Sequence, residues 1–284
     1  MKARFKFQKY GAMKFIGHLD VMRYFQKAFR RANFDNEYSK GFSPHQIMSF
    51  AAPLGVGLTS DAEYLDVSLL SSDEPSTMIE RLNSVLTEGF HIVEFHPLLE
   101  AEFNTKVVTA MSLVAAADYL VSLKDGYQLK EDISNQKEFQ AAFERFFDKQ
   151  EIVIGKKTKK SEQEVDIKPM IRLIAFCEEE YEEKLKAELS FSASTENSRM
   201  DGTEQNNCIN KTQSVAEAYD NGIKLYLQLD TGSSANLKPE LVLEAFYEEL
   251  GIPFEKFAWQ VHRLETYTRD EETGKLATLN QVPR

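Results

Sequence analysis

Residues 2–32 have the sequence KARFKFQKYGAMKFIGHLDVMRYFQKAFRRA, and the spacing of their apolar residues changes near His18. Before His18, Ala3, Phe5 and Phe7 alternate with basic residues. This period of two predicts a strand over Lys2–Gln8 with one buried face and one cationic face in water. After His18, apolar residues recur at steps of three and four, which predicts an amphipathic helix that ends near Ala32.

The following segments extend this strand and helix into a β-α-β-β-α-β order. Strands are predicted over 48–54, 63–70 and 90–95, because their apolar residues alternate. A helix is predicted over 76–86, because its apolar residues follow helical spacing. This order is that of the split βαβ, or ferredoxin-like, fold. We therefore predict an α+β protein whose residues 1–104 form a basic ferredoxin-like domain.

The second half contains similar elements in a less regular order. Strands are predicted over 117–123, 151–155, 170–176, 222–230 and 257–267, and helices over 136–148 and 238–250. Residues 105–284 are therefore expected to form a second α+β sheet domain. Within it, residues 190–221 are rich in Ser, Asn, Thr, Glu and Gln, which predicts a polar surface insertion.

Composition excludes several classes of protein. Lysines and arginines interrupt the first ten residues, and no later apolar run approaches the roughly 20 residues of a membrane helix, so we expect a cytoplasmic protein without a membrane partner. The two cysteines, Cys177 and Cys208, lack the spacing of a zinc or iron–sulfur site. Phosphate-binding loops, dinucleotide fingerprints and nucleophile elbows are also missing. We therefore expect no cofactor and no metal.

Charge is distributed unevenly along the chain, whose net charge is −11. Residues 1–50 contain ten lysines and arginines but only three acids, a net charge of +7. The remaining residues therefore carry −18. A basic amino-terminal part in an acidic protein suggests a polyanionic partner.

The predicted first helix carries a row of basic residues beside its apolar face. Arg23, Lys27, Arg30 and Arg31 are spaced at i, i+4, i+7 and i+8 and share one stripe. Such a stripe can contact phosphates. A solvated helix face, with arginine stems over the core edge, is the alternative.

The segment Tyr38–His45 contains Gly, Pro, Ser, Lys, His and two aromatic residues. Ser39, Lys40, Gly41 and His45 are candidate ligand contacts because such a turn allows close backbone approach and offers several hydrogen-bond donors. An ordinary turn is the alternative. A second basic run gives the candidates Lys159, Lys160 and Lys168, for which a solvated hairpin is the alternative.

Enzymatic activity stays open as a second reading. His18 or His45 could act as an acid–base group, oriented by Asp20 or Glu63. This reading requires that these side chains meet in one cleft. His18, Asp20 and His45 could in principle bind a metal together. If the strand after His45 begins beyond that residue, however, His18 and His45 lie at opposite ends of the sheet, and a shared site fails.

Five blocks of the amino-terminal part resemble the bacterial radical SAM-linked proteins. They are Phe15-Ile16-Gly17-His18-Leu19-Asp20-x-x-Arg23, Arg30-Arg31-Ala32, Tyr38-Ser39-x-Gly41-Phe42-x-Pro44-His45, Ser49-Phe50-Ala51-x-Pro53-Leu54 and Ser60-x-x-Glu63-Tyr64. Weaker similarity continues through Lys159-Lys160, Asp166-x-Lys168-Pro169, Asn236-Leu237-Lys238-Pro239-Glu240 and Arg263-Leu264-Glu265-Thr266-Tyr267. Residues 190–221 depart from the family's pattern.

Members of that family occur beside, or fused to, radical S-adenosylmethionine proteins, often near genes for an RNase E/G-type nuclease and a ribosomal protein. The resemblance thus implies a partner and a setting in tRNA or rRNA metabolism. We expect an RNA-binding or substrate-presenting accessory subunit of a radical S-adenosylmethionine enzyme, with no DNA partner. A stand-alone enzyme and a pure protein scaffold are the alternatives.

Overall fold

The computed structural model describes residues 1–98, 109–157, 162–189, 213–232, 235–270 and 273–281. The first half has the predicted β-α-β-β-α-β order, with a short 3-10 helix, η1 (Gly11–Phe15), after the first strand. The elements are β1 (Lys2–Lys9), α1 (His18–Arg31), β2 (Met48–Phe50), β3 (Thr59–Ser68), α2 (Pro75–Asn83) and β4 (Phe90–Leu98).

The second half contains all the predicted elements and several more. The strands are β5 (Val114–Leu123), β6 (Val153–Lys157), β7 (Glu162–Asp166), β8 (Ile171–Ala175), β9 (Lys224–Asp230), β10 (Trp259–Arg269) and β11 (Leu276–Thr278). The helices are α3 (Ala110–Leu113), α4 (Gln136–Phe147), α5 (Glu178–Glu188) and α6 (Pro239–Leu250), with the 3-10 turn η2 (Lys168–Met170). None of the helices in the described ranges combines the length and apolar composition that a membrane crossing needs.

The α+β class is confirmed, but the two halves contribute to one mixed nine-stranded sheet instead of one sheet each. Its order is β4-β1-β3-β10-β5-β9-β8, with β2 beside β3 and β11 beside β10, while β6 and β7 form a separate hairpin. Short β2 covers only Leu65–Val67 of β3. The start of β3 is therefore free to pair with β10, where Thr59 and Ser60 lie opposite His262 and Arg263. Whether the chain divides into domains at residue 104 stays a prediction.

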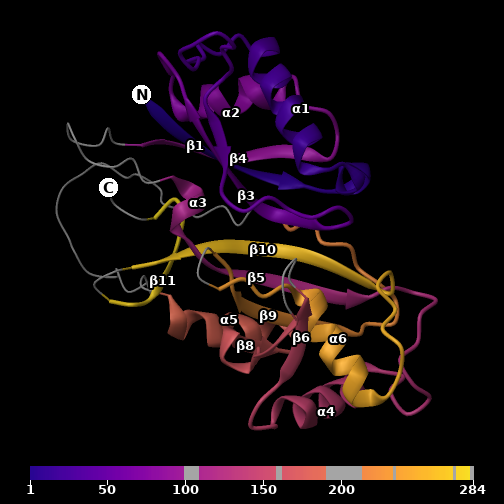
Figure 1. Cartoon of the computed structure of the whole chain (residues 1–284). Helices are drawn as coiled ribbons and strands as arrows, with labels where there is room; N and C mark the ends of the chain where they lie inside the picture. The colour runs from indigo at the N-terminus through magenta and orange to yellow at the C-terminus, as the bar shows by residue number, and fades with distance from the viewer. Residues whose placement is uncertain (99–108, 158–161, 190–212, 233–234, 271–272, 282–284) are drawn as a thin grey trace, which may run out of the picture.

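Each half has its own hydrophobic core. In the first half, Phe25 and Phe29 of α1 pack on Phe5 and Phe7 of β1, with ring centroids 5.3 Å apart for Phe5–Phe29. In the second half, α4 and α6 pack together through aromatic residues such as Phe143 and Phe246. The strand pairing of β3 with β10 thus joins two separately packed layers (Figure 1).

Candidate nucleic-acid interface

Helix α1 directs its basic residues to solvent. Its buried residues Val21, Phe25, Ala28 and Phe29 face the core, and this fixes the opposite side of the helix as the exposed one. Arg23, Lys27, Arg30 and Arg31 are all exposed there, as the helical spacing predicts.

The cations of this row are weakly neutralised. Arg23 contacts Asp20 at 3.2 Å, but both side chains are 65% exposed, and such surface pairs contribute little. Arg31 donates to the carbonyl of Val85 and lies over the ring of Tyr24. Among the described residues, no hydrogen bond or ion pair is formed by the side chains of Lys27 and Arg30. The row therefore presents positive charge to solvent.

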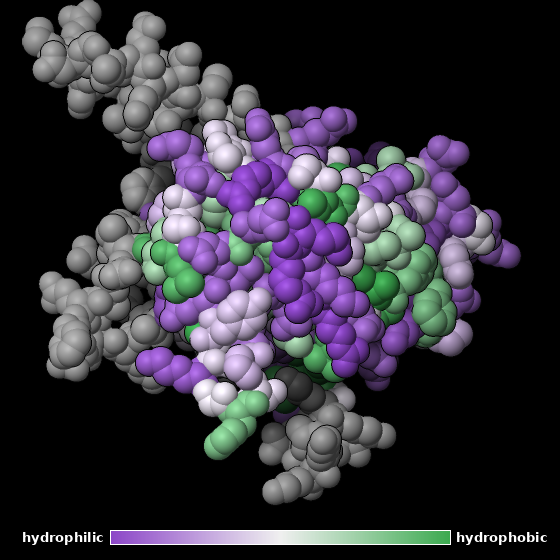
Figure 2. All heavy atoms as spheres, turned by 90° about the horizontal axis from the view of Figure 1, so that it is seen from above, coloured by the Kyte–Doolittle hydropathy of each residue, from purple (hydrophilic) through white to green (hydrophobic). Residues whose placement is uncertain are grey.

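The Tyr38–His45 loop begins shortly after α1 ends, and both lie on the upper side of the molecule in Figure 1. Its two ends are tied by the amide of Ser39, which donates to the carbonyl of His45 at 2.8 Å, and by Ser39 Oγ and His45 Nδ1 at 2.9 Å. Gly41 has a φ of +119°, which a side chain would disfavour. Lys40 is exposed and Phe42 is fully exposed at the tip. Seen from above, this face is mainly hydrophilic, with small separate apolar areas (Figure 2).

The prediction of a cationic wet face on β1 is wrong. Arg4 is buried and donates to both carboxylate oxygens of Asp66, at 2.6 and 3.0 Å. Lys6 binds Glu94 at 3.2 Å and Glu265 at 2.8 Å. Burial opposes the charge of Lys6, but these two carboxylates outweigh it and raise the pKa of Lys6. The alternation of β1 is real, yet its polar face meets acids of β3, β4 and β10 instead of water.

The candidates His18 and Glu63 line the same small recess together with Lys9. Its volume is about 10 Å³, room for no more than one water molecule. Glu63 is buried, accepts a hydrogen bond from Arg263 at 2.8 Å, and has its pKa raised by burial. Burial and the charge of Lys9 lower the pKa of His18. Among the described residues, no hydrogen bond joins His18 to Glu63.

The other two acid–base candidates lie elsewhere. His45 is bound to Ser39 in its own loop, and Asp20 is exposed beside Arg23. Within the described ranges, no three His, Cys, Asp or Glu side chains gather closely enough to hold a metal ion.

The second basic run is not part of the α1 face. Lys159 and Lys160 lie outside the described residues. Lys168 donates to the carbonyl of Lys149 and lies 5.3 Å from the ring of Phe147 at the end of α4. In Figure 1, α4 lies at the opposite end of the molecule from α1.

Asp61 is a polar centre that the sequence did not indicate. It accepts hydrogen bonds from His262 at 2.9 Å, from the hydroxyl of Ser214 at 2.5 Å and from the amide of Val215 at 2.9 Å. Burial opposes its charge, but the bonds from His262, Ser214 and Val215 lower the pKa of Asp61. These partners are 153 to 201 positions away in the chain, so no local pattern reveals the cluster. The described end of the predicted insertion is thus attached to the first half.

The chain also matches one known protein family. The model of the family described as "Uncharacterized protein conserved in bacteria (DUF2344)" matches residues 2–239, most of the chain. No curated protein matches this chain.

Proposed function

We propose that this chain, which belongs to the DUF2344 family of conserved bacterial proteins, is an RNA-binding accessory protein. We assign its RNA contacts to the α1 face, defined as Arg23, Lys27, Arg30 and Arg31, and to the adjoining Tyr38–His45 loop. The observation that carries the proposal is the exposed, weakly neutralised row of cations on α1 in a protein of net charge −11.

The contrast within the amino-terminal half supports this assignment. Arg4, Lys6 and Lys14 each bind an acidic side chain, so their charges stabilise the protein internally. The α1 face keeps its charge available to a partner. From Arg23 to Arg30 the helix rises about 10 Å, a span over which a nucleic-acid strand with one charge per ~3.4 Å carries about three phosphates.

Exposed aromatic residues in the loop that follows α1 favour RNA over an acidic protein surface. Phe42 is fully exposed and Tyr38 is 44% exposed in the loop after α1. Unpaired RNA bases stack on such side chains, while cations bind the phosphates. We therefore expect single-stranded or looped RNA to bind better than a duplex.

The resemblance to radical SAM-linked proteins extends the proposal to a partner. On that basis the protein presents tRNA or rRNA to a radical S-adenosylmethionine enzyme for modification or processing. An independent hydrolytic or acid–base activity has less support, since the recess lined by His18 and Glu63 holds about 10 Å³.

Fluorescence anisotropy with a labelled single-stranded RNA and with bulk tRNA tests the proposal across about 50 to 200 mM salt. The triple variant Arg23→Ala, Lys27→Ala, Arg30→Ala removes three exposed cations. The matched control, Lys137→Ala, Arg145→Ala, Lys256→Ala, removes three exposed cations from the second half. Each phosphate contact on a single strand contributes about −0.7 to the slope of log K against log salt.

We expect the α1 variant to weaken RNA binding by roughly tenfold or more and to reduce the salt slope by about 2. The control should match the unaltered chain. If the unaltered chain fails to retain RNA at low salt, or if both triple variants lose affinity equally, the proposal is wrong.

A further inference from the structure

A cavity of about 420 Å³ lies where the two halves of the chain meet. The loop after β2 forms one wall through residues such as Pro53 and Leu58. Residues of the second half form the other walls, among them Thr231, Lys238 and Arg263. Its size is within the range of small-molecule sites. It is separate from the α1 face, none of whose residues lines it.

Two deeply buried polar side chains line this cavity without full hydrogen bonding. Thr231 and Arg263 are each 6% exposed. Among the described residues, neither Thr231 Oγ1 nor Arg263 Nε has a hydrogen-bond partner, and Glu240 Oε2 also lacks one. Buried polar atoms are normally paired, so three unpaired ones around a single cavity indicate groups that await a ligand or accompanying water.

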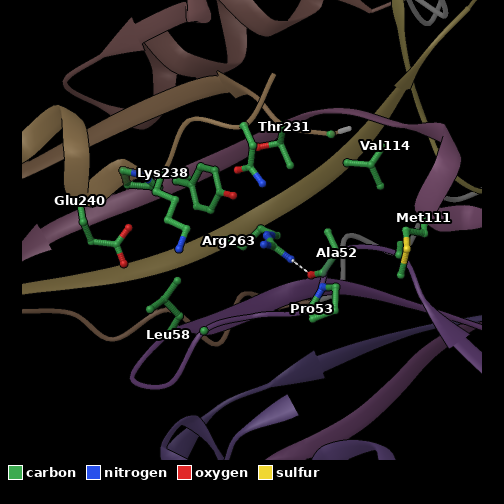
Figure 3. A pocket seen from close by; sticks show the side chains of 15 residues that line it. Ala52, Pro53, Leu58, Met111, Val114, Thr231, Lys238, Glu240 and Arg263 are labelled. Atoms are coloured by element: carbon green, nitrogen blue, oxygen red, sulfur yellow. Dashed lines mark hydrogen bonds between the residues drawn. The ribbon is translucent and has the colours of Figure 1, made fainter. Parts of the chain in front are cut away.

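Helix α6 begins at the same cavity. Lys238 occupies its N-cap position without a capping bond from the side chain, and Glu240 lies in the first turn. Both side chains extend from α6 toward the cavity, and Arg263 projects into its centre (Figure 3). Pro239 has no N–H and the amide of Leu241 donates to the carbonyl of Lys238, so the charge at this end comes from the positive end of the helix dipole and the ammonium of Lys238. Together these favour an anionic group such as a phosphate. The carboxylate of Glu240 favours hydroxyl or amino donors.

The opposite end of the cavity is apolar. Met111 and Val114 lie away from Lys238 and Glu240 in Figure 3, and Pro53 lies below Arg263, while Leu58 lies below Lys238. Such walls accept a flat ring system, and the flexible thioether of Met111 can adapt to it.

We propose that this cavity binds a nucleoside monophosphate, either free or as the terminal nucleotide of an RNA. The phosphate binds at the start of α6 beside Lys238. The ribose hydroxyls donate to Glu240, and the base lies between Pro53 and Met111, where Thr231 and Arg263 meet its polar edge. A fatty acid leaves Glu240 and Thr231 unpaired, and a single amino acid leaves much of the 420 Å³ empty. This inference goes beyond RNA binding by the α1 face and does not depend on it.

Isothermal titration calorimetry of the full chain with AMP, GMP, CMP and UMP tests the inference. The variants are Lys238→Ala and Glu240→Gln. Their matched controls are Lys256→Ala and Glu244→Gln, which alter exposed residues that do not line the cavity. A second arm compares short RNAs that carry a 5′-phosphate, a 3′-phosphate or no terminal phosphate, in the background of the triple α1 variant. A panel of amino acids is titrated in parallel.

We expect saturable binding of at least one nucleotide, which Lys238→Ala and Glu240→Gln each weaken by about tenfold, the loss of one charged contact. The controls should stay within about twofold of the unaltered chain. Binding of free nucleotides identifies them as the source, whereas binding confined to phosphate-ended RNA, lost in the same variants, identifies the RNA end. If no nucleotide binds up to about 10 mM, if amino acids bind instead, or if the cavity variants bind normally, the inference is overturned. Loss of RNA binding in the α1 variant alone leaves this result unchanged.

Discussion

Nη1 of Arg263 on β10 donates to Oε1 of Glu63 on β3 at 2.8 Å, across 200 positions of sequence. The two side chains are 7% and 5% exposed. The ammonium of Lys9 also interacts electrostatically with this carboxylate, so Glu63 compensates two buried cations. Because the pair lies beside the short β3–β10 pairing, it stabilises the contact between the two halves.

Replacement of Glu63 should therefore destabilise the protein strongly. Glu63→Gln leaves Arg263 and Lys9 without a counter-charge, and a broken buried ion pair costs about 3–5 kcal/mol of the free energy of unfolding. Urea denaturation measures this loss. The control is Arg172→Ala, which breaks a more exposed pair with Asp230 and should cost no more than about 1 kcal/mol. Equal losses of the free energy of unfolding in the two variants would show that the buried pair stabilises the protein no more than the exposed pair does.

The elements of the first half were predictable because each has one apolar face. The strand over Lys2–Lys9 and the helix over His18–Arg31 follow periods that depend only on neighbouring residues. Helix α5 was missed because its sequence, EEEYEEKLKAE, has only Tyr181 as a buried residue. The cationic face of β1 was misjudged because the acids that cover it lie 62 to 259 positions away.

The candidate sites also differ in whether they depend on neighbouring or on distant residues. The α1 face could be predicted, since its residues share one helix and the opposite side is apolar. The cavity beside Arg263 could not be predicted from the sequence. Thr231 directly follows β9, Lys238 directly precedes α6 and Arg263 lies on β10, and only the assembled fold brings them together.

Asp118 should make stability depend on pH. Its Oδ2 accepts hydrogen bonds from Tyr181 at 2.5 Å and Tyr267 at 2.8 Å, and burial raises the pKa of Asp118 to about 7 despite these bonds. The unfolded value is near 3.8. The folded state therefore binds the proton more tightly. This contribution to stability is complete below pH ~4, decreases by about 1.4 kcal/mol per unit as pH rises toward 7, and is then lost.

Chemical denaturation of Asp118→Asn between pH 4 and 7 checks this dependence. The amide stays neutral, so the variant's free energy of unfolding should vary less with pH than that of the unaltered chain. Asp20→Asn, at an exposed position, should leave the pH dependence unchanged. Identical slopes for Asp118→Asn and the unaltered chain would contradict the assignment.

Asp61 should hold Ser214 and Val215 in place against the first half. Asp61→Ala removes the acceptor of the Val215 amide and of the Ser214 hydroxyl. Hydrogen bonds to a charged acceptor contribute about 1.5–3 kcal/mol, so amide exchange at Val215 should accelerate roughly tenfold or more. The pKa of Asp61 is lowered in the fold, so acidification through that pKa should release the same two residues.

A matched variant separates this local effect from general destabilisation. Asp125 accepts hydrogen bonds from the amides of Asp220 and Asn221, further along the chain. Asp125→Ala should accelerate exchange at those two amides and leave Val215 protected. Faster exchange throughout α4 in either variant would mean that the whole protein has been loosened.

Phe42 tests whether the loop after α1 stacks on bases. Its side chain is fully exposed, so Phe42→Ala should leave the free energy of unfolding unchanged. The free energy of binding of this variant to single-stranded RNA should be less favourable by about 1–3 kcal/mol, the contribution of one base stacked on an aromatic ring. The salt slope should stay the same, because no phosphate contact is removed.

Phe257→Ala, at an exposed aromatic residue of the second half, is the control. Phe42→Tyr should retain affinity and Phe42→Leu should not, since leucine offers apolar surface without a π-face; if leucine binds RNA as well as phenylalanine, base stacking is not the role of this residue.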